Sequence, residues 1–118
     1  MELNILYEDN HLIAVEKPAG LLIQGDSSGD ETLIDRVKEY LRLKYRKPGE
    51  VFLGMVHRLD RPVSGAVLFA RTSKAASRLF TEFSSRNVLK VYCAAVHCPS
   101  ERAGFGEGWQ TLRGYLVR

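Results

Sequence analysis

The segment His57–Gly65, HRLDRPVSG, holds the densest group of side chains that could do chemistry. Within it a single carboxylate, Asp60, stands among the basic residues His57, Arg58 and Arg61. Nearby positive charge favours the ionised form of a carboxylate, and an ionised Asp can act as a nucleophile or as a general base. An Asp that caps a turn and pairs with a neighbouring Arg explains the same residues without catalysis. The residue types leave both interpretations open.

Tyr92 is a second candidate, because it lies in a segment whose composition is typical of a strand. Val88–Val96 is rich in β-branched and aromatic residues, which predicts a strand there. Strand alternation places Lys90 and Tyr92 on one face and Cys93 on the other. A half-buried tyrosine with a satisfied hydroxyl is the ordinary state of a strand Tyr, so the pattern alone does not assign it to a site.

Metal and hydrolase chemistry find less support. Cys93, His97 and Cys98 lie close together without a fourth ligand, which does not make a zinc site, and Cys93 is expected to be a small core residue. A His57–Asp60 pair could serve a hydrolase, but no Ser or Cys stands in a recognisable nucleophile elbow. Two cysteines without an export signal predict free thiols in the cytoplasm.

Strands and a helix are expected before the HRLDRPVSG segment. Short apolar runs around Ile5–Tyr7 and at Leu12–Val15 flank a polar turn, which predicts two strands. Residues Thr32–Arg46 are predicted to form a helix that Asp30 or Thr32 caps. Its apolar stripe has spacings of three and four and consists of Leu33, Ile34, Val37, Tyr40 and Leu41.

More elements are expected after that segment. Ala66–Ala70 is continuously apolar, which predicts a strand buried on both faces. A second helix is expected from Thr72 or Ser73 to about Arg86, and Thr111–Val117 could begin another strand. The inner face of this second helix is expected to comprise Ala75, Ala76, Leu79, Phe80 and Phe83.

Composition bounds the function classes. The chain has 118 residues and a net charge of +3, which suits one soluble domain and excludes a disordered chain. Residues 1–50 carry 7 basic and 10 acidic side chains, whereas residues 51–118 carry 10 basic and 4 acidic ones. The basic second part is either a solvated face or a surface that binds a polyanion. No apolar run approaches the length of a membrane span.

The string HRLDRPVSG, followed by AVLFART, closely resembles the catalytic signature of RluA-type pseudouridine synthases, HRLDRxTSG. Two further segments agree with that family in order and spacing. LYEDNHLIAVEKPAGLL is similar to its first block, a strand pair that ends in KPAG, and RNVLKVYCAAV is similar to its later K-x-Y block. Val63 stands where the signature has Thr, so the hydroxyl at that position of the loop is absent.

The resemblance implies an α+β fold with a mixed, largely antiparallel β-sheet flanked by helices. It implies an RNA pseudouridine synthase that isomerises uridine in structured rRNA or tRNA without a cofactor. Asp60 would start the reaction, Arg58 would help to take the uridine out of the stack, and Tyr92 would stack under the uracil and assist proton transfer. The remaining residues expected to bind substrate are His57, Arg61 and Lys90.

The family's catalytic domain is longer than this chain. Residues 1–118 are therefore expected to be its N-terminal part, without the later motif whose basic residue would face Asp60. A noncatalytic RNA-binding or regulatory remnant of the fold is the competing hypothesis, and a small hydrolase acting through Asp60 is a third. An unpaired strand edge, and self-association through it, are expected consequences.

Overall fold

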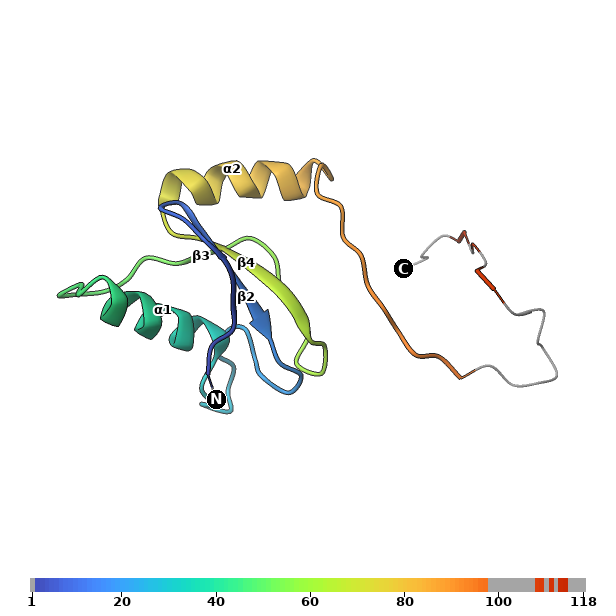
Figure 1. The fold of residues 1–118 in the computed structure, drawn as a ribbon, viewed down its shortest axis with the longest axis horizontal. Helices are drawn as coiled ribbons and strands as arrows, with labels where there is room; N and C mark the ends of the chain where they lie inside the picture. The colour runs from blue at the N-terminus through green and yellow to red at the C-terminus, as the bar shows by residue number, and fades with distance from the viewer. Residues whose placement is uncertain (1, 98–107, 110, 112, 115–118) are drawn as a thin grey trace.

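Four antiparallel strands form one sheet, in the order β1-β2-β4-β3 (Figure 1). The computed structural model describes residues 2–97, 108, 109, 111, 113 and 114. The elements in chain order are β1 (Ile5–Glu8), β2 (Leu12–Lys17), α1 (Leu33–Lys44), β3 (Gly54–Met55), β4 (Gly65–Ala70) and α2 (Ser73–Ser84). Strands and helices in this order confirm the α+β expectation.

The two central strands of the sheet are β2 and β4. The β1–β2 hairpin adds the strand on the other side of β2. The polar turn of the hairpin forms because Asp9 Oδ1 accepts hydrogen bonds from the amides of His11 (2.7 Å) and Leu12 (2.6 Å). β2 and β4 pair without a register shift along their whole length. This register places Lys17, the last residue of β2, opposite Gly65, where the HRLDRPVSG segment enters β4.

One face of the sheet is closed by α1, which the sequence predicted well. Thr32 caps the helix: its hydroxyl accepts a hydrogen bond from the Asp35 amide, and Asp35 accepts one from the Thr32 amide. Each buried apolar side chain contributes about 1.5–3 kcal/mol, so the cluster beneath α1 is the main source of stability. Its members are Ile13, Val15, Ile23, Leu33, Val37, Leu41, Val51, Val67 and Phe69.

A polar network ties the end of α1 to the sheet. The Glu8 carboxylate accepts hydrogen bonds from Tyr40, Lys44 and Tyr45, and Arg71 lies 3.3 Å from it. Burial raises the pKa of Glu8, but the hydrogen bonds from Lys44 and the two tyrosines outweigh that effect and leave it below its usual value. The strand that starts the hairpin is therefore held to the helix that covers it.

Two expectations about burial are wrong. Ala66 is exposed and Leu68 only half-buried, because α1 covers one face of β4 and the described residues cover the other only in part. Phe80 was expected on the inner face of α2 but is 65% exposed. Helix α2 packs on the sheet at its start, where Ala75 is buried and Ala76 lies beside Gly54 of β3.

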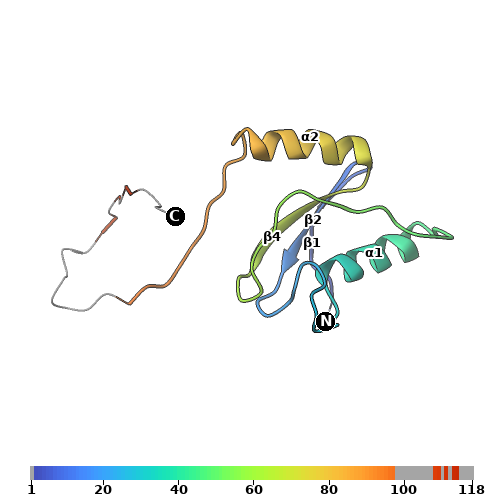
Figure 2. The ribbon, with the colours of Figure 1, turned by 180° about the vertical axis from the view of Figure 1, so that it is seen from behind.

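The predicted strand at Val88–Val96 is also wrong within the described part of the chain. Residues 88–97 run as an extended trace away from α2 without ladder bonds (Figures 1 and 2). A strand needs hydrogen bonds to a partner strand, and among the described residues this segment pairs with none. Leu89 is consequently 88% exposed, and Cys93 is exposed rather than a core residue.

Other expectations fall on parts of the chain of which less can be said. Cys98 and most of Thr111–Val117 lie outside the described residues. Among the described residues there is no group of side chains that could hold a metal ion. Nor does that part of the chain contain a helix long and apolar enough to cross a membrane.

Candidate active site

The HRLDRPVSG segment forms a loop between β3 and β4, so both of its ends lie at the sheet. It turns tightly after Asp60, whose carbonyl accepts a hydrogen bond from the Val63 amide (3.0 Å). Gly65 closes the loop at a φ of +146°, a conformation that L side chains rarely adopt. A Cβ there would lie 3.4 Å from Leu59 Cδ1, so the loop also packs against itself.

Lys17 anchors the loop from inside the protein. Its side chain is fully buried, and Nζ donates hydrogen bonds to the carbonyls of Pro18 (3.1 Å), Leu21 (2.7 Å) and Arg61 (3.0 Å). Burial lowers the pKa of Lys17, while the negative charge of Asp60 acts in the opposite direction. The ammonium group therefore joins the KPAG turn to the residue that follows Asp60.

Lys17 is not among the site residues that the sequence predicts. A signal was present in β2, where Ile13, Val15 and Lys17 alternate at every second position and so point to one face. All three are buried. A lysine that continues a buried apolar face must bond to internal acceptors, and that requirement could have identified it as a structural cation.

Arg61, which lies in the loop, also joins the loop to the KPAG turn. Its carbonyl accepts a hydrogen bond from the Gly20 amide (2.8 Å), and its Nε donates to the Gly20 carbonyl (3.0 Å). Its Nη2 lies 2.9 Å from Asp30 Oδ2 in an ion pair. Arg61 was expected to bind substrate, and the structure places it between the KPAG turn and the residues before α1.

Arg58 and Asp60 face solvent. Both residues are exposed, and within the described part of the chain neither forms an ion pair. An Asp60–Arg pair, the noncatalytic interpretation of the sequence, is therefore not formed among these residues. The carboxylate is open to a ligand on a loop whose backbone is fixed.

His57 points back towards the sheet. Its ring is half-buried, and Nε2 accepts a hydrogen bond from the Leu68 amide of β4 (2.9 Å). The imidazole stacks on the ring of Phe83 from α2, with centroids 4.8 Å apart and planes at 11°. Burial, with a smaller effect of the Lys90 charge, lowers the pKa of His57, so the neutral form predominates at neutral pH.

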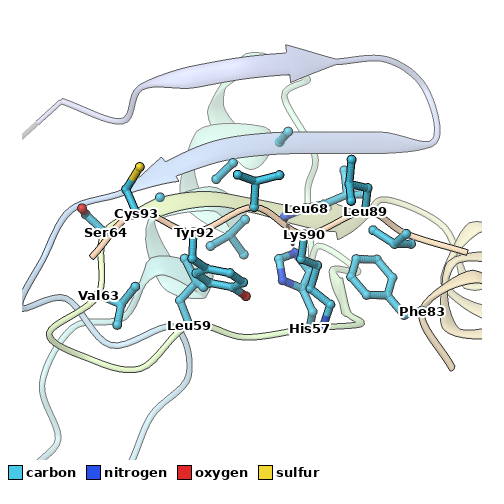
Figure 3. A pocket seen from close by; sticks show the side chains of 16 residues that line it. His57, Leu59, Val63, Ser64, Leu68, Phe83, Leu89, Lys90, Tyr92 and Cys93 are labelled. Atoms are coloured by element: carbon cyan, nitrogen blue, oxygen red, sulfur yellow. Dashed lines mark hydrogen bonds between the residues drawn. The ribbon is translucent and has the colours of Figure 1, made fainter. Parts of the chain in front are cut away.

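Tyr92 and Lys90 line a pocket of about 440 Å³ between the loop, β4 and the extended segment. Figure 3 shows Tyr92 pointing towards Leu59 and Lys90 towards His57, while Cys93 points the other way. The expected alternation is thus present even without a ladder. Asp60 and Arg58 do not line this pocket, and Tyr92 is 63% exposed, so the structure brings Tyr92 to the loop but not to the carboxylate.

Comparison with known proteins identifies what this arrangement resembles. Residues 11–111 match a family described as RNA pseudouridylate synthase. The chain is 39% identical over 98 residues to the ribosomal large subunit pseudouridine synthase D of Xanthomonas campestris, covering 80% of this chain and 28% of that protein. It is 39% identical over 118 residues to the tRNA pseudouridine synthase C of Pasteurella multocida, covering 99% of this chain and 40% of that protein.

Solved structures agree with the sequence matches. Human RNA pseudouridylate synthase domain containing 4 superposes with a TM-score of 0.60 at 25% identity, covering 71% of this chain and 30% of that one. Human RNA pseudouridylate synthase domain containing 1 gives a TM-score of 0.53 at 30% identity, with coverages of 72% and 29%. In each comparison described here the chain spans less than half the length of its relative.

Proposed function

Because the chain belongs to the RNA pseudouridylate synthase family, we propose that it takes part in isomerising uridine to pseudouridine in ribosomal or transfer RNA, with Asp60 as the catalytic residue. The observation that supports this most directly is that Asp60 is exposed and forms no ion pair with any described residue, on a loop whose neighbouring backbone is fixed. Residues 1–118 would form the N-terminal part of the catalytic domain. The cytoplasm is the proposed location.

The reaction sets what the residues must do. The glycosidic C–N bond of uridine breaks, the uracil turns, and a C–C bond forms between its C5 and the same sugar carbon; C5 then loses its proton and N1 gains one. The product is an isomer of the substrate, so no redox partner is needed. An ionised Asp60 would act as nucleophile or base, and a fixed loop would hold it in reactive geometry.

RNA must reach Asp60 as an extruded nucleotide, since the reacting atoms are inaccessible in a stacked base. Arg58 is exposed beside Asp60, and its planar guanidinium suits stacking on a base or pairing with a phosphate. Lys90 and Tyr92 would engage the substrate from the extended segment, with Tyr92 stacking under the uracil. His57 and Arg61 complete the set of expected substrate contacts, but their bonds within the chain favour a supporting role.

The test is tritium release from RNA labelled at uridine C5, using the complete gene product that carries this chain. Asp60→Asn is expected to lower the single-turnover rate by at least roughly a thousandfold, because it removes the reacting group, and to leave RNA affinity nearly unchanged. Asp26→Asn makes the same chemical change at another exposed carboxylate and should be without effect.

Turnover of Asp60→Asn at the wild-type rate would contradict the assignment. RNA binding by the wild type without tritium release would instead favour the alternative, a noncatalytic RNA-binding or regulatory protein. Self-association through an exposed sheet edge remains a prediction that sedimentation of the same sample would check.

A further inference from the structure

The edge of β4 that pairs with β3 has a different hydrogen-bond partner beyond the end of β3. The Arg71 amide donates to the His11 carbonyl next to β2, and ladder groups alternate in direction, so the amides of Leu68 and Ala70 point to the β3 side. Ala70 pairs with Gly54, but β3 ends one register position before Leu68. At that position the His57 side chain supplies the acceptor in place of a backbone carbonyl.

We propose that His57 is a positioning residue: its neutral imidazole extends the β4 ladder by one hydrogen bond and thereby fixes the first residue of the loop that presents Arg58 and Asp60. The second fixed point is Arg61, which Lys17 and Gly20 hold. Only Arg58, Leu59 and Asp60 lie between the two points. The inference rests on the proposed function only for the importance of Asp60.

The chemistry of the ring makes this anchor depend on protonation. Nε2 can accept the Leu68 amide proton only when the ring's single proton is on Nδ1. In the imidazolium form both nitrogens carry protons, so Nε2–H would face Leu68 N–H and the hydrogen bond would be lost.

The surroundings of the ring favour the neutral form. Phe83 from α2 covers one side of the imidazole, and Leu68 contacts it from β4, and neither carries a charge. Lys90 of the extended segment is the charged group among the described residues that acts on the ring, and it opposes a second proton. Acidification is therefore expected to release the loop at its His57 end.

The test is NMR spectroscopy of the 118-residue chain between about pH 8 and about pH 5, the range in which histidine titrates. In the wild type, imidazole ¹⁵N shifts should report the Nδ1–H form at high pH. The amides of Leu68 and Asp60 should then shift with the same midpoint as His57, and that midpoint should lie below the usual value for a histidine.

Two variants separate the hydrogen bond from the stacking. His57→Phe keeps an aromatic ring but has no acceptor, so exchange of the Leu68 amide should become roughly five- to tenfold faster. His57→Gln places an amide oxygen near the position of Nε2 and should restore slow exchange without the pH dependence. His11→Phe is the matched control and should change neither.

A wild-type Nε2–H tautomer, or a Leu68 amide that does not titrate with His57, would overturn the proposal, as would equal exchange in His57→Phe and wild type. None of these readouts depends on catalysis. Absence of tritium release by the complete gene product would therefore count against the proposed function and leave the result on His57 intact.

Discussion

The buried side chain of Lys17 fixes the backbone of the loop that carries Asp60. Among the described residues it forms no ion pair with a carboxylate and instead donates to three carbonyls, those of Pro18, Leu21 and Arg61, the last of them 44 residues further along the chain. Because a buried carbonyl without a donor is costly, these bonds determine where the backbone on either side of Asp60 lies. Precision at the carboxylate thus depends on a residue outside the HRLDRPVSG segment.

Replacing that cation should cost more than replacing a surface lysine. Lys17→Met fills a similar volume but removes the Nζ donor from the partly buried carbonyls of Pro18 and Leu21 and one of the two donors from the Arg61 carbonyl, so we expect a loss of about 2–4 kcal/mol in the free energy of unfolding. Urea denaturation monitored by circular dichroism measures it. Lys38→Met, on the partly exposed face of α1, should change stability by about 0.5 kcal/mol or less. Equal losses in the two variants would show that the Lys17 bonds contribute nothing specific.

At the scale of elements, the sequence predicted what local patterns determine. The stripe and the Thr32 cap specify α1, and Thr72 begins α2 as expected, because caps and helical spacing involve neighbouring residues. The run at Val88–Val96 has equally strong strand composition but does not pair among the described residues, since a ladder needs a distant partner. For the same reason the site could be predicted as a set of residues but not as a geometry. His57 bonds to the Leu68 amide, and Arg61 bonds to Gly20 and Asp30, and the sequence pattern does not reveal these partners.

The close contact between β3 and α2 depends on a glycine, Gly54, which has no side chain. A Cβ on Gly54 would lie 2.9 Å from Ala76 Cβ and 3.3 Å from Ala70 Cβ. Gly54→Ala should therefore push the strand from the helix and destabilise the fold by about 1–3 kcal/mol, measured as a fall in the urea midpoint.

A double-mutant cycle makes this prediction specific. Adding Ala76→Gly removes the nearer of the two contacts, so the double variant should recover part of the loss apart from the cost of glycine in a helix. Gly49→Ala is the control, because a Cβ there meets nothing within 4 Å. Additive losses at Gly54 and Ala76 would rule out the steric explanation.

For the whole molecule, the described part combines a packed sheet–helix unit with an extended segment that leaves it (Figure 2). The pocket wall contributed by Tyr92 and Lys90 belongs to that segment, whereas the loop with Asp60 belongs to the packed unit. Catalysis would require both to be held in one geometry. The hydrogen bonds and buried contacts among the described residues fix only the loop.

We therefore expect the isolated 118-residue chain to bind RNA weakly and to show no turnover in the tritium-release assay. With roughly two or three phosphate contacts, affinity should fall roughly ten- to fortyfold between about 50 mM and about 200 mM salt, because each contact releases counterions. Fluorescence anisotropy with a labelled RNA stem-loop measures this. Multiple turnovers by a monomeric 118-residue sample would show that the described unit already suffices for catalysis.

The burial of Lys17 also makes the acylation rate of its amine a measure of loop opening. An acylating reagent can modify an amine only where solvent reaches it, and the other five lysines (Lys38, Lys44, Lys47, Lys74 and Lys90) reach the surface, whereas Lys17 does not. Acylation of Lys17 must then wait until the KPAG turn and the Asp60 loop separate, so its rate relative to the surface lysines reports how often they part. An RNA that holds the loop closed would slow that single modification and leave labelling of the lysines it does not touch unchanged.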